Sequence, residues 1–410
     1  MAFFLSRQSG EEPRLGIYVH IPFCKSKCEY CDFYSIGGGR DRRMTDDYLQ
    51  ALADHIREAG RLAPNHLVDT VYFGGGTPSF FGADNLEKIL DEIHRSFRLS
   101  VEAEITVEAN PDSVNVQGLK RMLRAGFNRL SLGVQSDDDA MLKYLGRPHN
   151  FEQAQTAMQK ARQVGFANIS LDLMYGLPNQ TRAGWQETVE HIARMRPEHV
   201  SCYALKVEEG TPLYEYKDSV NLPSDDVQAD MYLDACEILR SYGFEHYEIS
   251  NFAKRGFASK HNLKYWTGGE YLGFGPTAAS DFDGKRFTAI RDLRGYIQGI
   301  AKHGQILSEL EHVPTRERAG EYIMLRLRTA RGIDIREFEN RFRQRFAPLA
   351  AILENCAAHG LARQTETGWC LTPRGFLVSN RIIGDLQEEL NREKVQRLAR
   401  AAQGDYRILE

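Results

Sequence analysis

The sequence predicts an α/β protein: an open, partial barrel of six β/α units, followed by a mainly helical C-terminal domain. Two observations carry this prediction. Strand-like and helix-like apolar patterns alternate from about residue 16 to residue 205, and arginine-rich helical patterns take over from about residue 310. Strands that alternate with helices pair in parallel through right-handed crossovers. Six units are too few to close the eight-unit barrel, so the sheet should stay open.

The individual elements follow from the spacing of apolar residues. The first strand alternates Ile17, Val19 and Ile21 and ends at Pro22, because proline cannot continue a strand ladder. Further strands are expected at 70–75, 104–109, 129–134, 169–175 and 199–205, and helices near 44–59, 84–97, 115–125, 151–164 and 181–195. Residues 206–300 are rich in Tyr, Gly and Phe. They are interpreted as an irregular extension that completes the open side of the barrel.

The C-terminal part has a different pattern, with helical apolar spacing and many arginines. Helices are expected at 317–329, 334–344 and 347–359, then two short strands around Trp369-Cys370-Leu371 and a helix near 373–381. Three helices and a hairpin resemble a winged-helix module. Residues 311–345 hold nine arginines against six acids, which is less basic than a DNA-binding module usually is. The predicted domains are therefore 1–205 (barrel), 206–300 (extension) and 301–410 (winged-helix-like, for packing or protein contact).

Composition excludes several classes of protein. The 410 residues carry 52 basic and 56 acidic side chains, a formal net charge of −4, which gives no general affinity for nucleic acid or anionic membranes. No stretch approaches the ~18 apolar residues of a spanning helix, and the apolar run near the N-terminus is too short for a signal peptide. Cys202, Cys236, Cys356 and Cys370 are scattered and are expected to be buried small hydrophobes. A reducing cytoplasm is the expected compartment.

Three cysteines lie within eight residues directly after the first strand: Cys24, Cys28 and Cys31. Thiolates at this spacing can converge on one soft metal centre. A cubane [4Fe–4S] cluster normally takes four cysteines, so three leave one iron open for a ligand from outside the protein. The alternative is a structural zinc site completed by a fourth ligand such as His20. A disulfide framework is disfavoured, because the number is odd and the chain is large.

Polar residues follow the other predicted strands, and parallel barrels bind ligands at these carboxyl ends. The run Gly74-Gly75-Gly76-Thr77-Pro78 follows the second strand and would let a ligand meet bare backbone, although it could be only a tight turn. Glu108 and Gln135 end the third and fourth strands. Asp172 lies inside the fifth strand, where a carboxylate is costly unless it is hydrogen bonded or used in a site.

The pattern Cys-x-x-x-Cys-x-x-Cys resembles the signature of radical S-adenosylmethionine (SAM) proteins. The flanking Tyr18-Val-His-Ile-Pro-Phe-Cys resembles one branch of them, the oxygen-independent coproporphyrinogen III oxidases and their relatives. The resemblance extends over about residues 14–380. It implies the open barrel of radical SAM proteins, a [4Fe–4S] cluster on Cys24, Cys28 and Cys31, and SAM on the open iron.

The same resemblance implies which residues line SAM. Those expected around the SAM that binds the cluster are Tyr18, Gly75, Thr77 and Glu108. In the oxidase of this branch a second SAM is held by residues that match Tyr30, Gly76, Gln135, Arg147, Asp172 and Ala204. Glu108 or Asp172 could accept hydrogen bonds from ribose hydroxyls. Arg147 could fork onto a methionine carboxylate, or it could form only a surface ion pair.

Three features distinguish the members of this branch. The oxidase carries a further cysteine where Phe33 stands, and it has a long N-terminal extension where only 23 residues precede Cys24. Residues 261–266, His-Asn-Leu-Lys-Tyr-Trp, resemble the marker His-Asn-x-x-Tyr-Trp of the heme chaperones. The candidate heme-binding residues are therefore His261, Asn262, Tyr265 and Trp266. A neutral imidazole can ligate iron and aromatic faces suit a porphyrin, although these residues could instead cap a turn and fill the core.

The expected function is that of a cytoplasmic heme chaperone that binds a [4Fe–4S] cluster, SAM and heme. Its acceptors would be heme-requiring proteins such as respiratory enzymes, as the family implies. The first alternative is a radical SAM enzyme that oxidatively decarboxylates coproporphyrinogen III. The second is a zinc-containing, winged-helix DNA regulator. Neither nucleic-acid binding nor a membrane span is expected, and a homodimer through the C-terminal domain is left open.

Overall fold

The computed structural model describes residues 12–38 and 41–402, which form two compact units. The first unit holds the chain up to Glu245, together with Phe252–Lys264 and Gly269–His312. The second unit holds His246–Asn251, Tyr265–Gly268 and the chain from Val313 onward. The domain boundaries expected near residues 205 and 300 remain predictions.

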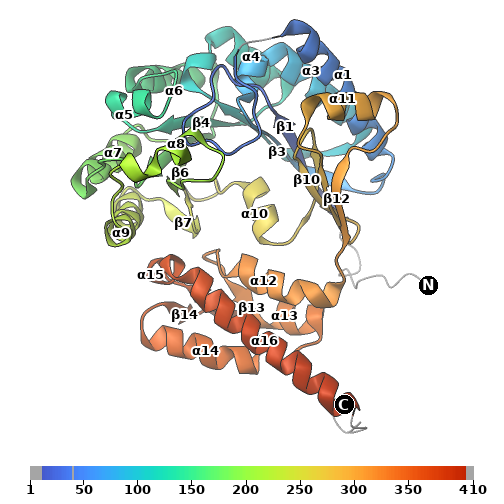
Figure 1. Cartoon of the computed structure of the whole chain (residues 1–410), viewed down its shortest axis with the longest axis vertical. Helices are drawn as coiled ribbons and strands as arrows, with labels where there is room; N and C mark the ends of the chain where they lie inside the picture. The colour runs from blue at the N-terminus through green and yellow to red at the C-terminus, as the bar shows by residue number, and fades with distance from the viewer. Residues whose placement is uncertain (1–11, 39–40, 403–410) are drawn as a thin grey trace. The chain divides into compact units, whose positions relative to one another are not determined.

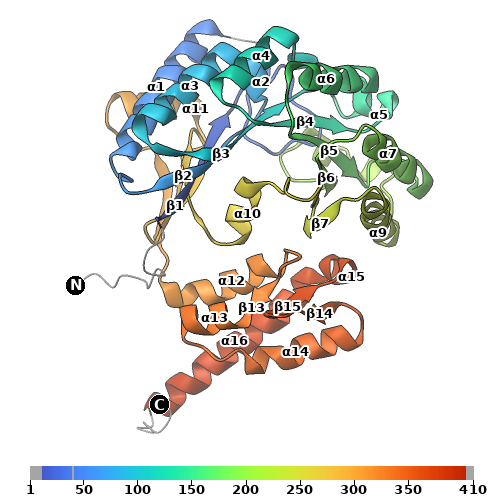
Figure 2. The same ribbon diagram turned by 180° about the vertical axis from the view of Figure 1, so that it is seen from behind.

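Six parallel strands form the middle of the main sheet, in the order in which they occur along the chain. They are β1 (Arg14–Ile21), β2 (Leu67–Gly75), β3 (Arg98–Ala109), β4 (Arg129–Gln135), β5 (Ile169–Tyr175) and β6 (His199–Ala204). The complete strand order is β12-β11-β10-β9-β1-β2-β3-β4-β5-β6-β8-β7. Because this order has two ends, the sheet is open, which confirms the predicted partial barrel (Figures 1 and 2).

The helices that follow these strands cover the outer side of the sheet (Figures 1 and 2). They are α1 (Arg42–Gly60), α2 (Pro78–Phe81), α3 (Ala83–Ser96), α4 (Val116–Ala125), α5 (Asp139–Tyr144), α6 (Phe151–Val164) and α7 (Arg182–Arg194), with a 3₁₀ turn at Pro111–Ser113. Their ends follow the capping chemistry of the sequence. Asn150 and Gln153 form a capping box at the start of α6, and Gly126 ends α4 in the left-handed conformation. The five predicted helices are all present within two residues of their expected bounds.

The segment after β6 is more regular than predicted. It contains α8 (Pro212–Glu215), a 3₁₀ turn at Lys217–Ser219, α9 (Asp225–Ser241), α10 (Lys260–Trp266) and α11 (Leu293–Ala301). Its strands are β7 (Glu245–Glu248), β8 (Asn251–Ala253), β9 (Glu270–Phe274), β10 (Ala279–Phe282), β11 (Lys285–Ala289) and β12 (Leu307–His312). These strands extend the sheet at both ends, and β9 lies parallel to β1, with Leu272 opposite Ile17.

The part of the second unit after Val313 is mainly helical, as predicted. It contains a 3₁₀ turn at Thr315–Glu317, then α12 (Arg318–Arg326), α13 (Ile335–Phe342), α14 (Ala347–Ala358), α15 (Pro373–Leu377) and α16 (Ser379–Ala402). A small antiparallel sheet joins β13 (Ile333–Asp334), β15 (Gly368–Leu371) and β14 (Ala362–Gln364). Phe338 packs against Tyr322, Phe342 and Phe346 in its core. In the described part of the chain, no helix combines the length and apolar character that crossing a membrane requires.

Candidate cofactor-binding site

The three cysteines of the motif lie on the loop that follows β1. Cys24 and Cys28 are buried and Cys31 is partly exposed, and all three are free thiols. The loop is fixed where it begins, because the Cys24 amide donates to the carbonyl of Ile36 at 3.0 Å and the Ile36 amide donates to the carbonyl of Pro22 at 2.7 Å. The sequence therefore holds three sulfur atoms on one short, anchored segment.

Two side chains from other parts of the first unit each reach one of these sulfur atoms: Thr77 directly after β2, and Arg147 between α5 and α6. The Thr77 hydroxyl lies 3.5 Å from the sulfur of Cys24, and Nη1 of Arg147 lies 3.7 Å from the sulfur of Cys28. Asn110 joins the two, because its Nδ2 donates to the Thr77 hydroxyl at 3.3 Å and its Oδ1 accepts from Nη2 of Arg147 at 2.8 Å. The family resemblance names Thr77 and Arg147 as SAM contacts, which remains a prediction, and it assigns no role to Asn110.

The cysteines suit a metal cluster by their chemistry. Burial raises the pKa of the Cys31 thiol to about 11 and also raises the pKa of Cys24, and the neighbouring Cys28 contributes to the increase at both. In the part of the chain that the structure describes, no group of three or more His, Cys, Asp or Glu side chains is arranged so that it could hold a metal ion. Burial therefore disfavours the thiolate forms of Cys24 and Cys31, and a bound cation would offset their charge.

His20, the fourth ligand of the zinc alternative, is engaged in the fold. The ring contacts the Tyr18 hydroxyl through Nδ1 at 3.2 Å and the carbonyl of Tyr34 through Nε2 at 2.8 Å. Burial lowers the pKa of His20 to about 4, so the ring is neutral at pH 7. Both ring nitrogens are hydrogen bonded, which argues against a role as a zinc ligand.

Two glycines, Gly75 at the end of β2 and Gly76 directly after it, pack closely against β1 and the cysteine loop. Gly75 has a φ of +110°, and a Cβ there would lie 2.6 Å from the ring of His20. A Cβ on Gly76 would lie 2.9 Å from the carbonyl oxygens of Ile21 and Phe23. Both positions therefore require glycine, because a side chain would collide with neighbouring atoms of the fold.

Glu108 sits at the end of β3 with a constrained carboxylate. The hydroxyl of Tyr72 donates to Oε1 at 2.7 Å, and the amide of Gly75 donates to Oε2 at 3.2 Å. Burial raises the pKa of Glu108 to about 7, and the negative charge of Asp172 raises it further. A carboxylate held by two donors keeps lone pairs free to accept from hydroxyl groups.

Asp172 on β5 is surrounded by serine hydroxyls and not by backbone groups. Ser201 donates to Oδ1 at 2.7 Å, Ser131 donates to Oδ2 at 2.9 Å, and Ser170 donates to Oδ1 at 3.1 Å. Burial raises its pKa, while these hydroxyls and the buried guanidinium of Arg129 lower it. The interior of the sheet thus holds two carboxylates in a largely dry environment, which is typical of functional sites.

Of the other residues expected around SAM, Gln135 and Ala204 lie at strand ends, Tyr30 lies on the cysteine loop, and Arg147 lies between α5 and α6. Gln135 ends β4 with a φ of +68°, and Ala204 ends β6 opposite Tyr175 of β5. The Tyr30 ring packs on the apolar cluster that includes Leu145 and Leu213. Arg147 reaches the carbonyl of Gly133 at the end of β4 at 2.6 Å. Arg147 thus connects the cysteine loop, Asn110 after β3 and the last part of β4.

The segment 261–266 forms helix α10, whose residues belong to both compact units. His261 and Asn262 are in the first unit, and Tyr265 and Trp266 are in the second. His261 is only 1% exposed, and its Nδ1 lies 2.9 Å from the Thr70 hydroxyl. In this position the imidazole is buried, so it could ligate heme iron only after moving.

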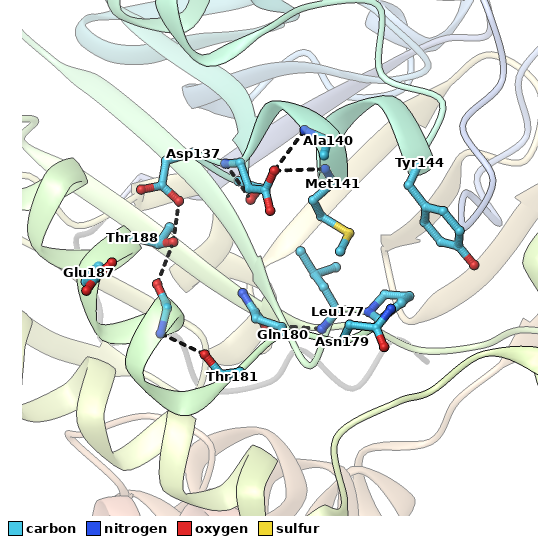
Figure 3. Close-up of a pocket in the computed structure, with 14 residues that line it drawn as sticks. Asp137, Ala140, Met141, Tyr144, Leu177, Asn179, Gln180, Thr181, Glu187 and Thr188 are labelled. Atoms are coloured by element: carbon cyan, nitrogen blue, oxygen red, sulfur yellow. Dashed lines mark hydrogen bonds between the residues drawn. The ribbon is translucent and has the colours of Figure 1, made fainter.

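A separate cavity of ≈590 Å³ lies between the loops after β4 and β5, and the sequence did not predict it (Figure 3). Its lining includes Asp137, Asp138, Tyr144 and Glu187. Asp137 accepts a hydrogen bond from Thr188 (Figure 3). Asp138 accepts from the amides of Ala140 and Met141 in the first turn of α5. The carboxylates of Asp137 and Asp138 are thus used within the fold.

Comparison with known proteins gives consistent matches over nearly the whole chain. Residues 18–192 match the family described as the radical SAM superfamily, and residues 313–378 match the HemN C-terminal domain. The heme chaperone HemW of Bacillus subtilis is 36% identical over 379 residues, which are 91% of this chain and 99% of that protein. The heme chaperone HemW of Escherichia coli is 33% identical over 376 residues, which are 90% and 97% of the two chains.

The fold likeness extends to a solved structure. Coproporphyrinogen III oxidase (HemN) from Escherichia coli, described as a radical SAM enzyme, superimposes with a TM-score of 0.79 over 92% of this chain and 90% of that chain. The two sequences are 24% identical, so this likeness concerns the fold. The mitochondrial radical S-adenosyl methionine domain-containing protein 1 of Bos taurus is 38% identical over 66% of this chain and 61% of that protein.

Proposed function

Because this chain belongs to the HemW family of radical SAM proteins, we propose that it is a heme chaperone, which binds heme and passes it to heme-requiring acceptor proteins. One observation carries the proposal: the likeness to curated heme chaperones extends over about nine tenths of the chain at 32–36% identity. The oxidase alternative has weaker support, since the likeness to the oxidase structure is one of fold.

The cofactors of the family have plausible ligands on this chain. Cys24, Cys28 and Cys31 would hold a [4Fe–4S] cluster, with Thr77 and Arg147 donating to the sulfur atoms. Hydrogen bonds to cluster sulfurs are one means by which a protein sets the potential of a cluster. Such a cluster, when bound, supplies one-electron reduction at low potential.

SAM would bind at the carboxyl ends of the strands. The residues in question are Tyr18, Gly75, Thr77 and Glu108, with Tyr30, Gly76, Gln135, Arg147, Asp172 and Ala204 for a second molecule. Glu108 would accept from ribose hydroxyls, because two donors already fix the direction of its carboxylate. Gly75 and Gly76 are partly exposed and carry no side chain, so SAM would contact their backbone beside the cysteine loop.

Heme would contact the second unit through the end of α10. Trp266 lines a cavity of ≈20 Å³ together with Arg318, Tyr322, Arg341 and Phe342. This volume is about that of one water molecule, and Glu321 also lines it, so neither the macrocycle nor a propionate would enter. The porphyrin ring would lie on the aromatic surface, and a propionate would pair with the arginines at the edge of that surface. Burying ~400 Å² of porphyrin would contribute about 10 kcal/mol gross against an association cost of ~4–15 kcal/mol. Such a balance gives a reversible hold, as a carrier requires.

Titration of the anaerobically reconstituted chain with heme, followed by absorbance, tests this function. We expect saturable heme binding, weaker binding of the heme dimethyl ester, and no turnover of coproporphyrinogen III in the presence of SAM and a reductant. Arg341→Ala should weaken heme about tenfold, the effect of losing one charge-assisted hydrogen bond. Arg336→Ala removes an exposed arginine from the same helix and should have no effect. Formation of protoporphyrinogen IX would establish the oxidase instead.

The remaining family expectations for this chain are also proposals. The acceptors would be proteins such as respiratory enzymes, the compartment would be the cytoplasm, and a homodimer would form through the C-terminal part. His261 and Asn262 stay candidate heme contacts, and ligation by His261 would require its ring to move out of the first unit.

A further inference from the structure

The first turn of α10 is fixed to two strands of the first unit. The Glu104 carboxylate on β3 accepts from the amide of Lys260 at 3.1 Å and from the amide of His261 at 3.0 Å. Nζ of Lys264 lies 2.8 Å from Oδ1 of Asp69 on β2, and the lysine side chain is only 8% exposed. These contacts hold the backbone of His261 against the strands that carry part of the proposed SAM site.

The imidazole of His261 lies flat against Tyr72. The two ring centroids are 5.2 Å apart at an interplanar angle of 26°, and Tyr72 also stacks on Tyr18 at 6.2 Å and 26°. Thr70 fixes the rotation of the imidazole, because its hydroxyl lies 2.9 Å from Nδ1. Burial lowers the pKa of His261 to about 3, so the ring is a neutral, planar packing group at pH 7.

Tyr72 in turn determines where the Glu108 carboxylate lies. Its hydroxyl donates to Oε1 at 2.7 Å, and the amide of Gly75 donates to Oε2 at 3.2 Å. A Cβ on Gly74 would lie 2.9 Å from the Tyr72 ring and 3.1 Å from Glu108, so the glycine is needed for this close packing. The contacts therefore run without interruption from the His261 ring, through Tyr72, to the carboxylate of Glu108.

We propose that His261 is a positioning residue of the SAM site: its ring holds Tyr72 in place, and the Tyr72 hydroxyl orients Glu108 toward the ribose of SAM. The inference rests on the proposed role of Glu108 in SAM binding. It gives the histidine of the His-Asn-x-x-Tyr-Trp motif a role that needs no bond to heme iron. A flat ring at position 261 is then the essential property, and a metal-binding nitrogen is not.

Substitutions at positions 261 and 72 test the inference in the anaerobically reconstituted chain. SAM affinity is measured by isothermal titration, and the change of the reduced-cluster electron paramagnetic resonance spectrum on SAM addition gives a second readout. His261→Ala should weaken SAM about tenfold, as expected when a hydrogen bond to a charged group loses its geometry. His261→Phe keeps a flat ring and should bind SAM within about twofold of the original chain, a difference of about 0.4 kcal/mol.

A double-mutant cycle shows whether His261 acts through Tyr72. Tyr72→Phe removes only the hydroxyl and should weaken SAM about as much as His261→Ala. In the Tyr72→Phe background, His261→Ala should then have no further effect. Iron content and thermal unfolding show whether each variant is folded and carries its cluster. If His261→Ala does not fold, the SAM affinities of His261→Phe and Tyr72→Phe still test the inference.

Two results would overturn the inference. One is unchanged SAM affinity in a folded, cluster-loaded His261→Ala variant. The other is a loss for His261→Ala that is equally large with and without the Tyr72 hydroxyl. Failure of the proposed function is recognised separately, because the original chain would then bind no SAM or, in the heme titration, no heme.

Discussion

Replacing Glu108 by glutamine should change the pH dependence of stability in a direction that the structure fixes. Burial raises the pKa of this carboxyl from 4.5 to about 7 in the folded chain. A raised carboxyl pKa means that the folded state holds its proton more tightly than the unfolded state. Its contribution to stability is therefore complete below about pH 4.5 and is lost as pH rises through about 7.

The size of the effect follows from this difference and from the contacts of the carboxylate. At about 1.4 kcal/mol per pKa unit, Glu108 lowers the unfolding free energy by about 3 kcal/mol at pH 8, of which about 2 kcal/mol is lost between pH 5.5 and pH 8. Glutamine can keep the bond from Tyr72 but cannot accept from Gly75 through its amide nitrogen, at a cost of about 1–2 kcal/mol. We expect Glu108→Gln to be slightly less stable than the original chain at pH 5.5 and about 1–2 kcal/mol more stable at pH 8.

Urea unfolding at the two pH values measures this change in the first unit. Trp185 is fully buried there, so its fluorescence reports that unit in a chain where Trp266 and Trp369 are replaced by phenylalanine. The matched control is Glu102→Gln, which changes an exposed glutamate on the same strand and should leave the pH dependence as it was. An unchanged difference between pH 5.5 and pH 8 in Glu108→Gln would refute the assignment of a raised pKa. The higher stability of Glu108→Gln at pH 8 should coincide with weaker SAM binding, because the Glu108 carboxylate is costly to bury and useful for function.

Two further substitutions test contacts around the site. Arg147→Met removes the donors to the Cys28 sulfur and to two oxygen atoms, so it should destabilise the first unit by about 2–4 kcal/mol and lower the iron retained per chain. The control is Arg124→Met, which replaces an exposed arginine on α4. Equal iron content in both variants would contradict a role of Arg147 in holding the cluster. Lys264→Met leaves the Asp69 carboxylate without its ammonium partner. Amide hydrogen exchange in α10 should then become faster by the equivalent of about 2 kcal/mol. Unchanged protection of the α10 amides would show that the ion pair does not hold the helix.

Local patterns in the sequence were sufficient for much of the fold. The alternation around Ile17 and the apolar spacing of the later helices predicted six strands and five helices, because backbone periodicity and capping act over a few residues. The segment 206–300 was not predicted well. Its strands are short, and β9 is recognisable as a strand mainly because β1 offers it a partner. Pairing of this kind depends on contacts that the linear spacing does not contain.

By itself the sequence determined the cysteine loop, since Cys24, Cys28 and Cys31 are neighbours in the chain and their spacing alone fixes three sulfur donors on one loop. Only the tertiary structure decided what surrounds them. Asn110 joins Thr77 to Arg147, and Tyr72 stands between Glu108 and His261, although these residues are far apart in sequence. The physical reason is that parallel strands bring their carboxyl ends to one edge of the sheet, and side-chain contacts across that edge depend on strand order and register.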